Sequence, residues 1–112
     1  MIKMMAAICR KPGITHAEYL AYVQHVHGAI SNEQPLMLRR YVQNHIDGER
    51  TRPDIPTTAV EIDGVAELWF DDQAALETAA HTPEMKALHA DGAKFIGRIK
   101  SYVVEEKFVI GS

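Results

Sequence analysis

Residues 63–70, DGVAELWF, carry the pattern from which the fold can be argued. Successive side chains of a strand point to opposite faces, so this segment would present two separate sets of residues. The two sets are Ala66, Leu68 and Phe70 on one face, and Val65, Glu67 and Trp69 on the other. Both sets are largely apolar. We therefore expect a strand within a sheet that is covered on both sides.

Three other segments predict further strands of the same sheet. They are apolar-rich runs bounded by turn residues such as Pro12-Gly13 and Asp47-Gly48. The runs are residues 2–10, 36–46 and 99–108. Residues 49–61 contain two prolines and no clear period, which predicts a long loop that could serve as a lid.

Two helical regions are expected between these strands. Thr15 and Glu18 form a capping-box pattern, and apolar residues follow at helical spacing, so a helix should begin here and end near residues 28–32. Asp71 is expected to cap a second helix, which Thr82 and Pro83 restart. The apolar side of the restarted helix is expected to carry Met85, Leu88, Phe95 and Ile96.

The resulting order, β-α-β-β-α-β, predicts an α+β fold in which a four-stranded antiparallel sheet has helices on one face. The 112 residues fit a single domain, 1–112. Two helices can cover only one face of the sheet, and the other face also carries apolar side chains. A second copy of the chain is the simplest cover, so we expect a homodimer.

Composition restricts the partners and the compartment. A net charge of −3 and a pI near 6.0 argue against a nucleic-acid surface. No apolar run approaches the roughly 20 residues that span a bilayer, and the first residues lack the layout of a signal peptide. Cys9 is the single cysteine, so no internal disulfide can form. We expect a cytoplasmic protein that binds neither membrane nor nucleic acid.

The histidines do not suggest a metal site. His25 and His27 would diverge by about 200° around a helix, and His81 and His89 would lie roughly 12 Å apart along one. No HExxH, cysteine-pair or nucleotide-binding motif is present, so we expect neither a metal nor a cofactor. His27, however, falls on the apolar stripe of its helix, as either a satisfied core histidine or a residue of a site.

Polar residues gather on two of the predicted strands. In the second strand, Arg39, Tyr41, Gln43 and His45 would share a face, which is either an exposed edge or the wall of a site. Glu67 lies between apolar neighbours, where burial would raise the pKa of its carboxyl group toward that of a neutral-pH acid or base. The alternative for Glu67 is an ion pair with an arginine such as Arg39.

With these elements in place, the chain resembles the EthD-domain family of the dimeric α/β-barrel superfamily. The segments that carry the resemblance are RKPGIT, EYLAYVQHVHGAI, LRRYVQNH, DGVAELWFDD and SYVVEE. The resemblance implies a ferredoxin-like protomer whose sheet closes with that of a partner into a barrel with a small-molecule cavity. The family's site positions correspond to His27, Tyr41, Asn44 and His45. Val23 and Ala29 stand where the family commonly has tryptophan and proline, so the mouth of the cavity should differ.

Two kinds of function follow from this resemblance. The first is a cofactor-independent lyase, isomerase or cyclase acting on a small, largely apolar carbonyl compound. His27 or His45 would move a proton, Tyr41 with Arg39 would hydrogen-bond the enolate, and Glu67, Asn44 and Trp69 would complete the site. The second is a non-catalytic small-molecule-binding or accessory protein. Some members of the superfamily are cofactor-free monooxygenases, which gives a third possibility.

Overall fold

The computed structural model describes residues 1–27 and 37–111, except for the side chains of Val26 and His27. The strands are β1 (Ile2–Arg10), β2 (Leu38–His45), β3 (Gly64–Phe70) and β4 (Ile96–Val104). The helices are α1 (His16–Tyr22), α3 (Gln73–Ala80) and α4 (Pro83–Gly92), and a π-helical turn, η1 (Val23–His27), continues α1. The predicted end of the first helix, near residues 28–32, lies outside the described residues.

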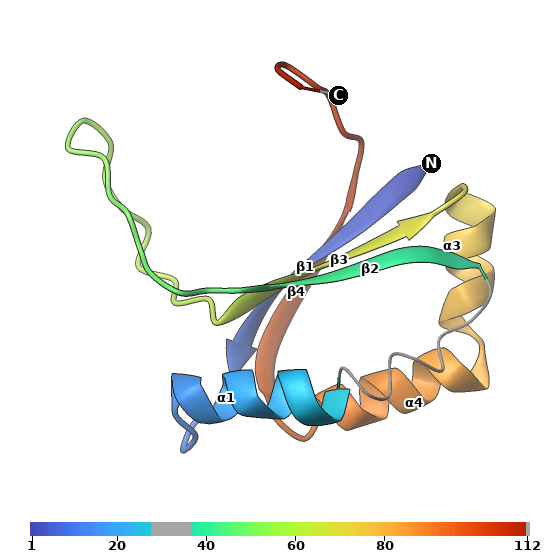
Figure 1. The fold of residues 1–112 in the computed structure, drawn as a ribbon, viewed down its shortest axis with the longest axis horizontal. Coiled ribbons are helices and arrows are strands. Elements are labelled where there is room, and N and C mark those ends of the chain that lie inside the picture. The colour runs from blue at the N-terminus through green and yellow to red at the C-terminus, as the bar shows by residue number, and fades with distance from the viewer. Residues whose placement is uncertain (28–36, 112) are drawn as a thin grey trace.

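The four strands form one antiparallel sheet in the order β2-β3-β1-β4. The helices lie together on one side of this sheet (Figure 1). The α+β, ferredoxin-like fold that the sequence predicts is therefore confirmed, with the second helical region divided into α3 and α4. The sheet of the single chain is open and does not close on itself.

The core lies between the sheet and the helices. On the sheet side it is built from buried side chains of β1 and β3, which alternate as predicted for residues 63–70. The side chains of the core are Ala6, Ile8, Tyr19, Val23, Leu38, Ala66, Leu68, Phe70, Ala79, Met85, Leu88 and Phe95. The opposite face, which we call the open face, carries Lys3, Glu67 and Trp69 and has no helix over it (Figure 1).

The capping box at the start of α1 is present as predicted. The Glu18 backbone N–H donates to Thr15 Oγ1 over 3.1 Å, and the Thr15 N–H donates to Glu18 Oε1 over 2.9 Å. These bonds satisfy backbone donors that the first turn of a helix leaves without partners. Thr15 and Glu18 thus fix the start of α1 at His16.

The second helical region departs from the prediction at both of its ends. Asp72, not Asp71, caps α3, because its Oδ1 accepts the Ala75 N–H over 2.8 Å. Thr82 caps α4 with Pro83 in the first turn, as expected. However, α4 ends at Gly92, so Phe95 and Ile96 lie beyond the helix.

The last strand is consequently shifted toward the N-terminus. It spans Ile96–Val104 instead of the predicted residues 99–108. Gly97, the second residue of this strand, stands where no side chain fits, since a Cβ there would lie 2.7 Å from the Arg10 carbonyl oxygen. Phe95 fills the core just before the strand, at 2 % exposure.

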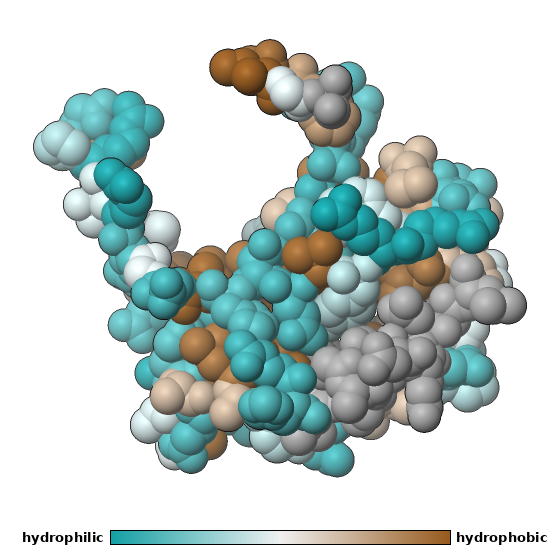
Figure 2. All heavy atoms as spheres, in the orientation of Figure 1, coloured by the Kyte–Doolittle hydropathy of each residue, from teal (hydrophilic) through white to brown (hydrophobic). Residues whose placement is uncertain are grey.

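Two segments extend away from the body on the side of the open face (Figure 1). One is residues 47–62, here called the arm, which includes the predicted long loop 49–61 and whose residues 47–61 are all exposed. The other is the tail, residues 105–111, whose Phe108, Val109 and Ile110 are strongly exposed and form the brown tip in Figure 2. Among the described helices, none is long and apolar enough to cross a membrane.

Candidate functional site

A cavity of about 410 Å³ lies between the helix-covered face of the sheet and α4. Its wall is predominantly apolar, with Met4, Ala6, Leu68 and Leu88 among the lining side chains. A cavity of this kind, with a few polar groups in an apolar wall, is typical of small-molecule sites. Its polar lining residues, among those described, are Tyr41, His89, Arg98 and Ser101.

Tyr41 is the predicted site residue that lines this cavity. It stands on β2 opposite Leu68 of β3, on the helix-covered face. Burial raises the pKa of the Tyr41 phenol, and a hydrogen bond with Gln43 acts in the opposite direction without cancelling the rise. The side chain therefore stays a neutral phenol near pH 7, able to donate a hydrogen bond to an oxygen of a ligand.

His45 lies on the same face of β2, four residues after Tyr41. Its Nδ1 is 3.0 Å from Gln24 Nε2, and its Nε2 is 3.2 Å from Gln43 Oε1. Because an amide nitrogen only donates and an amide oxygen only accepts, these contacts select the neutral tautomer with its proton on Nε2. Both ring nitrogens of His45 are thus engaged by protein side chains.

A second, much smaller pocket of about 20 Å³ adjoins His45 and Tyr41. The pocket shares four lining residues with the large cavity, so the two adjoin each other: Ile8, Tyr41, Ala66 and Ile96. His27 ends the π-helical turn η1, but its side chain lies outside the described residues, so its predicted place in the site stays a prediction.

Glu67, Asn44 and Trp69 lie on the other side of the sheet, on the open face. Asn44 Nδ2 donates to Glu67 Oε1 over 2.7 Å, and the Lys3 ammonium donates to Glu67 Oε2 over 2.7 Å. The expected convergence of Glu67 and Trp69 with Tyr41 and His45 on one cavity is therefore wrong. The physical reason is strand alternation, which sends neighbouring positions to opposite faces.

The expected direction of the Glu67 pKa is also wrong. The hydrogen bond from Lys3, and then that from Asn44, lowers the pKa of the Glu67 carboxyl group, and burial opposes them without prevailing. Glu67 is consequently ionised near neutral pH and paired. Its ion-pair partner is Lys3, not an arginine such as Arg39.

Trp69 and Glu106 complete the group on the open face. The Trp69 Nε1–H donates to Glu106 Oε1 over 3.0 Å, and Lys3 Nζ lies 3.2 Å from Glu106 Oε2. The Arg40 guanidinium stacks over the Trp69 ring at 4.7 Å from its centroid. These contacts hold the first residues of the tail against the sheet.

Arg39 does not share the face of Tyr41, Gln43 and His45. The pairing of β2 with β3 shifts between Leu38 and Arg40, which takes Arg39 out of the alternation. Its guanidinium instead makes two hydrogen bonds to the exposed Asp71 carboxylate, of 3.1 and 2.8 Å. The predicted role of Arg39 beside Tyr41 is therefore wrong.

His89 lines the large cavity, and sequence reasoning considered it only as a metal ligand. It lies one helical turn after the buried Met85 and next to the buried Leu88 in α4. That spacing, at the border of the apolar stripe, was the signal that could have placed His89 in the wall of a pocket.

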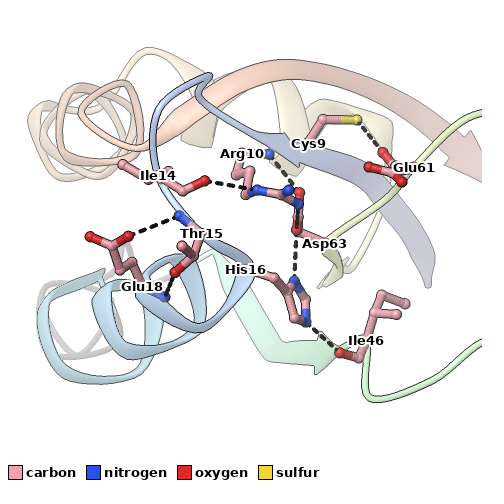
Figure 3. Close-up of polar contacts among 9 residues, drawn as sticks. All are labelled: Cys9, Arg10, Ile14, Thr15, His16, Glu18, Ile46, Glu61 and Asp63. Carbon is pink, nitrogen blue, oxygen red and sulfur yellow. Dashed lines mark hydrogen bonds and ion pairs between the residues drawn. The ribbon is translucent and has the colours of Figure 1, made fainter.

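A second cluster that sequence reasoning missed joins α1 to the ends of β1 and β3 (Figure 3). His16 Nδ1 lies 2.7 Å from Asp63 Oδ1, and His16 Nε2 lies 2.8 Å from the Ile46 carbonyl oxygen. Arg10 donates its backbone N–H to Asp63 Oδ2 over 2.7 Å and its Nη1 to Oδ1 over 2.8 Å. The local sequence does not predict this cluster, because Asp63 is 47 positions from His16 and 53 positions from Arg10 along the chain.

The described part of the chain contains no group of three or more histidine, cysteine, aspartate or glutamate side chains placed to hold a metal ion. Cys9 is half-buried and donates its thiol to the Glu61 carbonyl oxygen over 2.9 Å.

Comparison with known proteins identifies relatives of this arrangement. Residues 11–99 match the model of the family described as "EthD domain". The structure is similar to that of an EthD family protein from Bacillus halodurans, with a TM-score of 0.73 and 24% identity. The match covers 96% of this chain and 99% of that chain. None of the curated proteins compared with the chain matches it significantly.

Two more distant structures share the fold. A dimeric protein of unknown function with a ferredoxin-like fold, from Bacteroides fragilis, has a TM-score of 0.65 and 15% identity, with 94% of this chain and 95% of that chain covered. SnoaB, a cofactor-independent oxygenase from Streptomyces nogalater, has a TM-score of 0.61 and 10% identity, with 99% and 97% covered. At these identities the likeness concerns the fold.

Proposed function

Because this chain belongs to the EthD domain family, we propose that it is a cofactor-independent enzyme that transfers protons on a small, largely apolar carbonyl compound. The reaction would be that of a lyase, an isomerase or a cyclase. The observation that carries the proposal is the apolar cavity of about 410 Å³, with the Tyr41 phenol in its wall.

Tyr41 would stabilise the charge that develops on the carbonyl oxygen when a neighbouring C–H bond is broken. A neutral phenol donates a hydrogen bond without first giving up a proton, and its raised pKa keeps it in that form. A donor aimed at a developing oxyanion in an apolar cavity contributes roughly 100- to 1,000-fold in rate.

The base would be His45 or His27. Unprotonated Nδ1 of His45 accepts the Gln24 amide in the absence of a ligand, so a substrate would have to displace Gln24 from it. Gln24 is exposed, so water can form hydrogen bonds with its amide group after it is displaced. His27 follows Gln24 by three residues in η1 and is the alternative base. Glu67, Asn44 and Trp69 take no part, since they lie behind the sheet.

We propose that a second copy of the chain covers the open face, so that the two sheets close into a barrel. The Lys3, Glu67 and Trp69 group would then be buried between the copies. Support comes from the similar structures from Bacteroides fragilis and Thermobifida fusca, which are described as dimeric. The arm and the tail both extend toward this side, where a second copy would lie between them (Figure 1).

The runner-up is a non-catalytic small-molecule-binding protein that uses the same cavity. One specific observation favours it: both ring nitrogens of His45 are hydrogen-bonded to glutamine side chains. A histidine that is held in this way can serve to position Tyr41 and Gln43 without moving a proton.

Exchange of carbon-bound hydrogen with solvent tests the proposal. A panel of small apolar ketones, 1,3-diketones and enol lactones would be incubated with the protein in D₂O, and loss of the α-proton signals followed by ¹H NMR. We expect catalysed exchange for at least one compound, and a decrease of about 100-fold or more with Tyr41→Phe. Tyr22→Phe removes the same hydroxyl from a tyrosine that lines neither the large cavity nor the pocket beside His45, so it is the matched control and should leave the rate unchanged.

The outcomes separate the candidate functions. Chemical-shift changes at cavity residues without any exchange would support the binding protein. Substrate-dependent consumption of oxygen, recorded with an oxygen electrode, would indicate a cofactor-free monooxygenase. Exchange that survives Tyr41→Phe unchanged would remove Tyr41 from the mechanism.

A further inference from the structure

Residues 47–61 of the arm are all exposed, and their hydrogen bond to the described body is the one from the Cys9 thiol to the Glu61 carbonyl oxygen, two residues before Asp63. The direction of the arm must therefore be determined where it leaves β2, at Ile46, and where it enters β3, at Asp63. The backbone holds these two ends together through an Ile46 N–H to Asp63 carbonyl bond of 3.2 Å. One side chain from a different element, His16 of α1, contacts both ends (Figure 3).

The two contacts of His16 require the imidazolium form. Nδ1 faces a carboxylate oxygen of Asp63 at 2.7 Å, and Nε2 faces the carbonyl oxygen of Ile46 at 2.8 Å. Both oxygens are acceptors only, so each ring nitrogen must carry a proton. A neutral ring would leave one lone pair pointing at an oxygen lone pair, and that contact would break.

The contact that breaks on deprotonation is the one to Ile46. Asp63 is held by two hydrogen bonds from Arg10 and is only 3 % exposed, so it would keep the remaining ring proton on Nδ1. The Ile46 carbonyl, a neutral acceptor at the rim of a pocket, would lose its partner. We propose that protonated His16 is a clamp that fixes the arm to the body, and that its deprotonation releases the β2 end of the arm.

The charged groups around His16 favour this behaviour on balance. Asp63 faces the ring directly, and the carboxylates of Asp47, Glu49 and Glu61 lie around the same pocket. Arg10 opposes protonation from β1, and so does the positive end of α1, since His16 is its first residue. The hydrogen bond to Asp63, followed by that to Ile46, raises the pKa of His16 above its ordinary value. Release is thus expected above pH 6.5.

The titration of His16 and the exchange of one backbone amide test the clamp together. Imidazole signals of the ¹⁵N-labelled protein would be followed from pH 5.5 to 9, and compared with those of the same protein unfolded in urea. The protection factor of the Ile46 amide, relative to an unfolded chain at each pH, would be measured on the same samples. We expect His16 to titrate at a higher pH than the histidines of the unfolded chain, and the Ile46 protection to fall about tenfold through that midpoint.

Two variants keep the test decisive. His16→Phe retains a ring without donors, so Ile46 should show low protection at every pH. If His16→Phe fails to fold, Asp63→Asn serves instead, and should lower the His16 midpoint and the pH at which protection is lost. His81→Phe is the matched control. A His16 midpoint at or below that of the unfolded chain, or Ile46 protection that does not change with pH in the unaltered protein, would overturn the clamp.

Discussion

The Lys3 ammonium lies 2.7 Å from Glu67 Oε2, and together these residues place a paired charge on the otherwise uncovered side of the sheet. Lys3 is only 8 % exposed even in the single chain. Its hydrogen bond to Glu67 raises the pKa of Lys3 against the opposing effect of burial. The pair explains why a carboxyl group among apolar neighbours is ionised. Glu67 is thus engaged on the open face, on the opposite side of the sheet from the proposed site.

Removing one member of this pair should destabilise the protein. Glu67→Gln leaves a nearly buried ammonium without its closest anion, so the free energy of unfolding should fall by about 1–3 kcal/mol. Urea titration at pH 7 measures this change. Glu105→Gln, in a strongly exposed pair with Lys107, is the control and should change stability by less than about 0.5 kcal/mol. Equal effects of both substitutions would show that the Lys3–Glu67 pair contributes no more to the free energy of unfolding than an exposed ion pair does.

The Lys3–Glu67 pair also predicts how the free energy of unfolding changes at acid pH. The pKa of Glu67 is lowered in the folded protein, so its contribution is present above the unfolded value, near 4.3, and is lost as the pH falls through the folded value. Glu67→Gln should therefore flatten the decline in unfolding free energy below about pH 5. Denaturation by urea at a series of pH values would show this, and parallel profiles for both proteins would contradict it.

Much of the fold could be predicted because its signals are local. The alternation in residues 63–70 and the Thr15–Glu18 capping box both depend on neighbours within a few positions. The site was harder, because a bulge between Leu38 and Arg40 changes which side chains share a face. Arg39 therefore does not lie beside Tyr41 as predicted, whereas Tyr41 and His45 do share one face of β2.

Long-range contacts were the other source of error. The Lys3–Glu67 pair joins residues 64 positions apart, and the His16–Asp63 contact joins residues 47 positions apart. Nothing in either local sequence specifies its partner, because the pairing of β1 with β3 brings Lys3 to Glu67 and the position of α1 beside the strand ends brings His16 to Asp63. The expectation of a raised Glu67 pKa failed for this reason: burial was visible from the sequence and the neutralising lysine was not.

A glycine at the start of β3 gives a prediction about packing. A Cβ on Gly64 would lie 2.8 Å from Tyr19 Oη and 3.2 Å from the Asn44 carbonyl oxygen, so Gly64→Ala must displace one of them. We expect a loss of about 1–3 kcal/mol in unfolding free energy, measured by urea titration. Gly48→Ala is the matched control, because nothing lies within 4 Å of its Cβ position. A neutral Gly64→Ala would show that Tyr19 moves at little cost.

Asp63 gives a further prediction, independent of the arm. Burial pushes the pKa of Asp63 upward, but hydrogen bonds from the Arg10 backbone, His16 and the Arg10 guanidinium outweigh it, and the pKa is lowered. Asp63→Asn removes the negative charge from this nearly buried position and should cost about 2–4 kcal/mol. Asp54→Asn, in an exposed ion pair on the arm, should have little effect on the same urea titration. A cost below about 1 kcal/mol would contradict the role given to Asp63.

The most direct test of the central claim is the crystal structure of the protein with a compound selected by the exchange experiment. We predict density for the ligand in the cavity between the sheet and α4, with its carbonyl oxygen within hydrogen-bonding distance of the Tyr41 hydroxyl. Density on the open face beside Glu67 and Trp69, with the cavity empty, would contradict the account.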